Sequence, residues 1–154
     1  MKDCAMSLVS KLPVFQISIH SGGMAVREAL KRLMDGLKPL SLDVEEAGTV
    51  ELVMAEALNN IVEHAYPEGD PHGPISITCS HARDGLHMTV VDNGRAMPDG
   101  QTPLGTPAQT DVALNDMPEG GFGWFLIKDL AKDVTYDRIN AENHLKLRLA
   151  VAIG

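Results

Sequence analysis

The chain has 154 residues, of which 44% are hydrophobic and 22% charged, so we expect one globular domain with a buried core across residues 1–154. Its formal net charge of -8 argues against nucleic-acid backbones and anionic membranes as partners, because both reward clustered positive charge. With two cysteines and no apolar run near the roughly 20 residues that cross a bilayer, the sequence predicts a cytoplasmic protein.

The first half of the chain predicts one strand and two helices. Val14–His20 alternates apolar and polar side chains, which is typical of a half-buried strand. Met24–Leu37 has apolar side chains at steps of three and four residues, which predicts an amphipathic helix. A longer helix is expected to begin near Ser41 or Asp43, either of which can cap it, and to end at Tyr66 before a proline.

The second half predicts a hairpin, a long loop, a helix and two more strands. Pro74–Ser80 and Leu86–Asp92 are β-rich runs joined by the short link His81–Gly85, so we expect an antiparallel hairpin. The stretch of about residues 95–121 is the kind of long loop that is usually functional, and we interpret it as a lid. The remaining elements are a helix at Phe122–Lys132 and strands at Val134–Ile139 and His144–Val151.

This order of elements predicts an α+β fold. We expect a two-layer α/β sandwich with a mixed, mostly antiparallel sheet and three main helices on one face. Cys79 and His81 lie two residues apart, but a metal site needs three or four convergent ligands, so we expect Cys79 to be a buried thiol on a strand.

A polar stripe runs along the long predicted helix. Glu56, Asn60 and His64 recur every four residues, which places them on one face. A carboxylate can accept a proton, and a carboxamide oxygen can ligate a hard cation such as Mg²⁺. Glu56 is therefore a candidate general base and Asn60 a candidate metal ligand, although such a stripe taken alone is more often a solvated helix face.

Two further motifs are candidates for ligand binding. Asp92–Gly94 ends a predicted strand, where ligand groups are commonly placed, although Asp-Asn-Gly is also an ordinary turn. Gly120, Gly121, Phe122 and Gly123 lead into the last helix, where glycine amides can cradle phosphate oxygens, with a flexible link as the alternative. This loop is neither a Walker A sequence nor a dinucleotide-binding fingerprint.

These three motifs in this order resemble the GHKL ATPase superfamily, and within it the small anti-sigma-factor serine kinases of bacteria. The likeness covers almost the whole chain and implies a Bergerat-type ATPase fold. Glu56–Tyr66 is similar to the family's asparagine box, and Gly120–Lys128 to its second glycine box. Asp92 and Gly94 match its first glycine box, whereas Ala96 stands where many members have a second glycine.

The resemblance also implies roles for these residues, with ATP and Mg²⁺ as cofactors. Glu56 would activate a protein serine or threonine hydroxyl, and Asn60 would hold the Mg²⁺ that bridges the ATP phosphates. Asp92 would accept a hydrogen bond from the adenine amino group, and Gly94 would let the ring approach. The other nucleotide-binding positions carried over are His64, Ala96, Gly120, Gly121, Phe122 and Gly123.

The function implied is that of an anti-sigma factor with serine/threonine kinase activity. Such a protein binds a sigma factor and phosphorylates a STAS-domain antagonist in a partner-switching system, and a homodimer is possible. Two alternatives stay open: a module that binds ATP and sequesters its partner without turnover, and an ATPase whose glutamate activates water. A histidine kinase is disfavoured, because one strand and one helix stand where a phosphoacceptor helix pair would precede Asp43.

Overall fold

The protein's core is a single open β-sheet. The computed structural model describes residues 12–97 and 126–151, and all statements on the fold concern these ranges. The sheet has the order β1-β2-β3-β5-β4, and each pair of neighbouring strands is antiparallel. The strands are β1 (Phe15–His20), β2 (Pro74–Ala82), β3 (Gly85–Asp92), β4 (Lys132–Ile139) and β5 (Glu142–Leu149).

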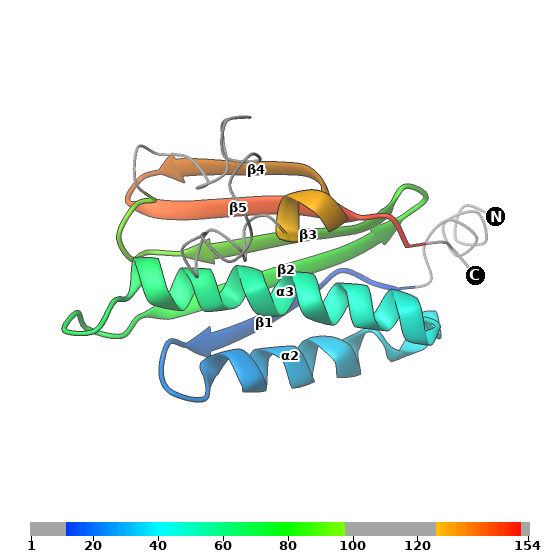
Figure 1. The fold of residues 1–154 in the computed structure, drawn as a ribbon, viewed down its shortest axis with the longest axis horizontal. Helices are drawn as coiled ribbons and strands as arrows, with labels where there is room; N and C mark the ends of the chain where they lie inside the picture. The colour runs from blue at the N-terminus through cyan, green and yellow to red at the C-terminus, as the bar shows by residue number, and fades with distance from the viewer. Residues whose placement is uncertain (1–11, 98–125, 152–154) are drawn as a thin grey trace, which may run out of the picture.

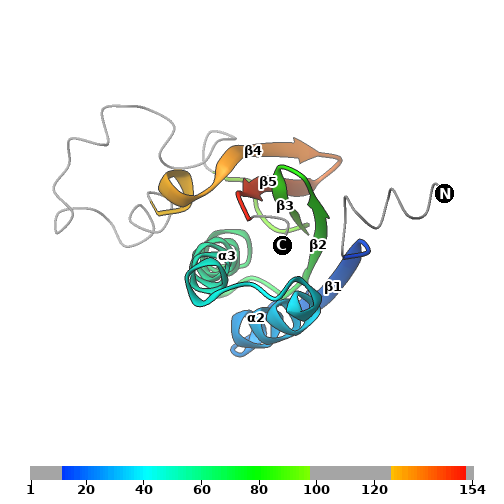
Figure 2. The ribbon, with the colours of Figure 1, turned by 90° about the vertical axis from the view of Figure 1, so that its right-hand side faces the viewer.

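The helices form a second layer on one face of the sheet, as predicted (Figure 1). In the end-on view, α3 lies in the hollow of the curved sheet and α2 lies beside β1 (Figure 2). A short helical segment, residues 126–130, lies on the same side next to β4. The helices are α2 (Ala25–Gly36), the 3₁₀ turn η1 (Lys38–Leu40) and α3 (Val44–Ala65). None of these helices is both long and apolar enough to cross a membrane.

Helix α3 begins where its sequence provides a reciprocal cap. Asp43 Oδ1 accepts the backbone N–H of Glu46 at 2.8 Å, and Glu46 Oε1 accepts the backbone N–H of Asp43 at 3.3 Å. The helix then buries one apolar face against the sheet, and this packing fixes its rotation about its own axis. The residues buried along it are Val50, Val53, Met54, Ala57, Leu58, Asn60, Ile61 and Ala65.

The β2–β3 hairpin is tighter than predicted. His81 was expected in the link, but it belongs to β2 and pairs with Leu86 of β3. The alternation that buries Ile75 and Ile77 continues through Cys79 to His81, so the strand extends two residues further. A two-residue turn remains, and Gly85 follows it with a φ of +124°, which glycine adopts without strain.

Other predicted boundaries, in the last helix and the last two strands, also differ from the structure. The last helix was expected to reach Lys132, but Lys132 begins β4 and Asp133 has a φ of +52°, which is not helical. The final strand starts two residues before the predicted His144, because the turn at Asn140 and Ala141 needs only two residues. The sheet, expected to be mostly antiparallel, is antiparallel throughout the described strands.

Candidate functional site

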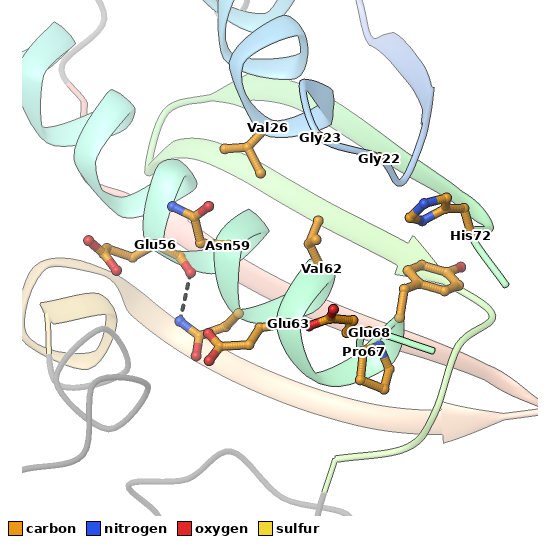
Figure 3. A pocket seen from close by; sticks show the side chains of 12 residues that line it. Gly22, Gly23, Val26, Glu56, Asn59, Val62, Glu63, Pro67, Glu68 and His72 are labelled. Carbon is orange, nitrogen blue, oxygen red and sulfur yellow. Dashed lines mark hydrogen bonds between the residues drawn. The ribbon is translucent and has the colours of Figure 1, made fainter. Parts of the chain in front are cut away.

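The polar stripe on α3 contains a buried amide with an unused oxygen. Asn60 is 3% exposed, and its Nδ2 donates to the backbone carbonyl of Glu56 at 2.7 Å (Figure 3). Its Oδ1 is buried and has no hydrogen-bond partner among residues 12–97 and 126–151. Because buried acceptors are almost always paired in folded proteins, an orphaned carboxamide oxygen indicates a place for a cation or donor from a ligand.

His64 repeats this feature one turn further along. Its Nε2 is also buried, and no described residue forms a hydrogen bond with it. Glu56, by contrast, is half-buried and reaches solvent. The stripe predicted from spacing is therefore not a solvated helix face, because two of its three side chains hold buried polar atoms that no residue in the described part of the chain pairs with.

An open pocket of about 830 Å³ lies over the outward side of α3. Glu56, Asn60 and Glu63 line it from the helix, and Gly22 and Gly23 line it from the loop before α2. Figure 3 shows Asn59 and Val62 of α3 on the side of Val26, while Glu56 and Glu63 point away from Gly22 and Gly23. The pocket gives the Glu56 carboxylate access from solvent, which proton transfer from an incoming hydroxyl requires.

Asp92 is a buried carboxylate at the end of β3. It is 4% exposed, and its Oδ1 accepts the Gly94 N–H at 2.9 Å and Asn143 Nδ2 at 2.7 Å. Burial raises the pKa of Asp92 above its ordinary value, while these two hydrogen bonds and the charge of Arg138 oppose that rise. Both donors from the described residues use Oδ1, so Oδ2 can accept from a ligand.

Position 94 must be glycine because the backbone at the end of α3 lies very close to it. A Cβ at this position would lie 2.2 Å from the carbonyl oxygen of Ala65, the last residue of α3. The same carbonyl accepts the Arg95 N–H at 2.9 Å. The glycine thus lets the turn after β3 dock on the end of α3, in addition to any role beside a bound ring.

Tyr66 holds the same junction from the other side. Its hydroxyl accepts the Asn93 N–H at 3.0 Å and lies within donating distance of Asn93 Oδ1 at 2.8 Å and the Pro74 carbonyl at 2.7 Å. Burial, the largest influence, raises the pKa of this phenol, so it stays a neutral hydrogen-bonding group. Tyr66 therefore joins the end of α3, the start of β2 and the turn after β3.

A cluster on β4 and β5 surrounds Asp92 and was missed in the sequence. Asn143 is 4% exposed and contacts Asp92, Tyr136 and Arg138 through its amide. One signal was available: the alternation of Leu145, Leu147 and Leu149, extended backwards, places a polar residue at 143 on the inward face. The partners of Asn143 could not be predicted, because they depend on strand register.

The site residues follow one another along α3. At about 1.5 Å of rise per residue, Ala65 lies about 14 Å along the helix from Glu56 and about 8 Å from Asn60. Because Gly94 packs on Ala65, the Asp92 turn marks one end of the line and Glu56 the other. The arrangement suits an elongated ligand that is held at one end by Asp92 and meets Asn60 before Glu56.

The remaining predicted site residues lie in the glycine-rich loop and at Ala96. Gly120, Gly121, Phe122 and Gly123 lie outside the described residues, as does most of the predicted lid. Ala96 is described and is exposed. Arg95, which follows the Asp92 turn, donates to both carboxylate oxygens of Asp70, at 2.7 and 2.9 Å.

Comparison with known proteins identifies relatives of this architecture. Residues 23–149 match the family described as histidine kinase-like ATPase domain. The chain is 35% identical over 99 residues to the serine/threonine-protein kinase BtrW of Bordetella bronchiseptica, which covers 64% of this chain and 67% of that protein. It is 33% identical over 95 residues to the serine-protein kinase RsbW of Staphylococcus aureus, covering 60% of this chain and 57% of that protein.

A solved structure shows the same fold. The crystal structure of the RsbU and RsbW domains of a Mycobacterium tuberculosis protein matches with a TM-score of 0.62 at 17% identity. The match covers 90% of this chain and 32% of that one. The predicted α+β fold with helices over an open sheet is therefore confirmed, and the chain spans about two thirds or less of each of these three proteins.

Proposed function

The chain belongs to the histidine kinase-like ATPase family, and from this premise we propose that it is an ATP-dependent protein serine/threonine kinase. Its relatives named as serine or serine/threonine kinases support this activity. The observation that carries the proposal is the orphaned Oδ1 of Asn60, which lies on α3 between the Glu56 carboxylate and the Asp92 turn.

The donor set fits a nucleotide accompanied by Mg²⁺. A hard cation bound to phosphates usually keeps several waters and takes only one or two protein oxygens, and Asn60 Oδ1 is such an oxygen. Within residues 12–97 and 126–151, no three His, Cys, Asp or Glu side chains gather as a self-sufficient metal site. When bound, Mg²⁺ would neutralise charge on the phosphates.

Each side chain then has one task. Asp92 Oδ2 accepts a hydrogen bond from the adenine amino group. His64, in the tautomer that carries its hydrogen on Nε2, donates to an oxygen of the nucleotide. Glu56 takes the proton from the hydroxyl of the acceptor protein. The hydroxyl oxygen bonds to the γ-phosphorus, and the bond between the γ-phosphorus and the oxygen that bridges to the β-phosphate breaks, which leaves ADP. Gly120, Gly121, Phe122, Gly123 and Ala96 complete the proposed nucleotide site by resemblance.

The proposed partners are those that the sequence resemblance implies. We propose that the acceptor is a serine of a STAS-domain antagonist and that the kinase alternates between this antagonist and a sigma factor. The acceptor must reach Glu56 through the open pocket on α3, which leaves the carboxylate accessible from outside the protein. This role requires neither nucleic acid nor membrane.

Calorimetric titration with Mg-ATP tests the nucleotide site. We expect Asn60→Ala and Asp92→Asn each to weaken binding at least tenfold, which is about 1.4 kcal/mol. Gln16→Ala, which shortens an exposed carboxamide side chain on β1, is the control and should bind like the wild type. A wild-type protein that binds no ATP would overturn the proposed function.

Phosphotransfer separates the kinase from a module that only binds ATP. With γ-labelled ATP and purified STAS-domain proteins of the same organism, the wild type should label one of them on serine, and Glu56→Gln should reduce the rate by at least a hundredfold (on the order of a general base's contribution) while ATP still binds. Tight ATP binding without any labelled acceptor would instead favour sequestration without turnover.

A further inference from the structure

The side-chain amide of Asn143 makes four hydrogen bonds. Its Nδ2 donates to Asp92 Oδ1 at 2.7 Å and to the Arg95 carbonyl at 2.8 Å. Its Oδ1 accepts from the Tyr136 hydroxyl and, at 2.9 Å, from Arg138 Nη1. Two donors and two acceptor sites are all that a carboxamide offers, so this buried side chain is fully used.

The orientation of the Asn143 amide is fixed by neighbouring groups that can only donate hydrogen bonds. The Met97 N–H donates to the Tyr136 hydroxyl oxygen at 2.8 Å, so the tyrosine proton points to Asn143. The Arg138 guanidinium can only donate, and it also binds the Gly94 carbonyl at 2.7 Å. A flipped Asn143 amide would set its NH₂ against this cation and its oxygen against the Asp92 carboxylate.

Strand register places Asn143 where it can do this. It lies opposite Asp92 across the β3–β5 ladder and opposite Arg138 across the β4–β5 ladder. Arg138 and Tyr136 also bind backbone groups of the segment that leaves β3, at Gly94 and Met97. The three side chains of β4 and β5, here called the amide clamp (Tyr136, Arg138 and Asn143), thus hold both the Asp92 side chain and the chain that follows it.

We propose that the amide clamp determines purine selectivity by presenting Asp92 to the base as an ionised, acceptor-only group. The proposal rests on the proposed function, because it assumes that Asp92 meets the base. Adenine carries an amino donor at its six position, whereas guanine carries an oxygen acceptor there. An ionised carboxylate attracts the amino group of adenine and repels the oxygen of guanine. A protonated carboxyl, by contrast, could donate a hydrogen bond to the guanine oxygen.

Ionisation of this buried carboxyl depends on its neighbours. Desolvation raises the pKa of Asp92, and the hydrogen bond from Asn143 is the largest influence that lowers it again. The charged and titratable groups around it are Arg138 of β4, His144 of β5 and, at the end of α3, Tyr66. Loss of the clamp therefore moves the pKa of Asp92 upward, and adenine binding should fade at a higher pH than in the wild type.

The test is calorimetric titration of Mg-ADP and Mg-GDP over a pH series with intact protein. We expect Asn143→Ala to lower the ADP-to-GDP affinity ratio at least tenfold and to raise the pH at which ADP binding is lost. Arg138→Met, which removes the exposed cation that binds Asn143 Oδ1 and helps to keep Asp92 ionised, should shift both quantities in the same direction. Arg148→Met is the matched control, because Arg148 pairs with Asp133 and Asp84 away from the clamp.

The outcomes separate this inference from the function on which it rests. If the wild type binds ADP and both clamp variants keep its affinity ratio and pH profile, the clamp is only structural and the inference is overturned. If Asn143→Ala does not fold, as judged by circular dichroism, Arg138→Met decides alone. A wild type that binds neither nucleotide overturns the proposed function, and the inference with it.

Discussion

At the residue scale, Gly94 shows how a motif position can serve two purposes. Glycine is often explained by a positive φ, but the described glycines with positive φ are Gly69 and Gly85. At Gly94 the reason is contact, since an added Cβ would meet both the carbonyl and the Cβ of Ala65. The turn that carries Asp92 is therefore fixed to the end of α3 by the absence of a side chain.

We predict that Gly94→Ala destabilises the protein by about 2 kcal/mol, because the backbone must move to relieve the clash. It should also weaken Mg-ADP binding, since the movement displaces Asp92. Gly48→Ala provides the contrast: Gly48 lies in α3 with open space around it, and alanine there should stabilise the helix by up to about 1 kcal/mol. Urea denaturation measures both, and equal effects of the two substitutions would refute the contact argument.

At the scale of elements, the β4–β5 hairpin sets the register that brings Asn143 to Asp92. Its two-residue turn is Asn140 and Ala141, with φ values of +50° and +65°. Two successive residues with positive φ match the twist of the flanking strands, and asparagine followed by glycine is the preferred pair. Alanine at the second position keeps the register but carries backbone strain.

We predict that Ala141→Gly raises the free energy of unfolding by about 0.5–1 kcal/mol, since relief of left-handed strain exceeds the added entropy of the unfolded chain. The same change inside α3, Ala55→Gly, should lower the free energy of unfolding by about 1 kcal/mol. Thermal unfolding of the two variants beside the wild type checks this. A loss of stability in Ala141→Gly would show that the turn is not strained.

At the scale of the whole molecule, the buried Asp92 carboxylate opposes stability while it serves binding. Burial raises its folded-state pKa above the ordinary value of 3.8. Between these two pKa values the folded protein binds more protons than the unfolded chain, so the contribution of this group to stability falls as pH rises. Near neutral pH the full cost of the buried charge is present.

We predict that Asp92→Asn stabilises the nucleotide-free protein near neutral pH and that this gain shrinks as pH falls toward the ordinary range of aspartate. The amide oxygen can still accept from Gly94 and Asn143, so the hydrogen bonds survive without the charge. Urea titrations of both proteins across pH measure the difference. If Asp92→Asn is instead less stable at neutral pH, the carboxylate is a net stabilising group in the fold.

Much of the fold and part of the site followed from local patterns. The three-to-four-residue apolar period, the candidate caps at Ser41 and Asp43, the alternation in β1 and β5 and the β-rich run of β2 predicted these elements to within a few residues, because each is set by neighbours along the chain. The stripe of Glu56, Asn60 and His64 followed for the same reason, since helical spacing alone places them on one face.

Tertiary structure decided which of these side chains are unpartnered and what holds Asp92. The bond between Asn143 and Asp92 joins residues 51 apart in sequence, and the docking of Gly94 on Ala65 requires α3 and β3 to be packed already. Register across three strands and burial against a neighbouring layer are collective results of packing, so no local period encodes them. The sequence by itself therefore determined the elements and the candidate stripe, and only the assembled sheet decided how the buried carboxylate is positioned.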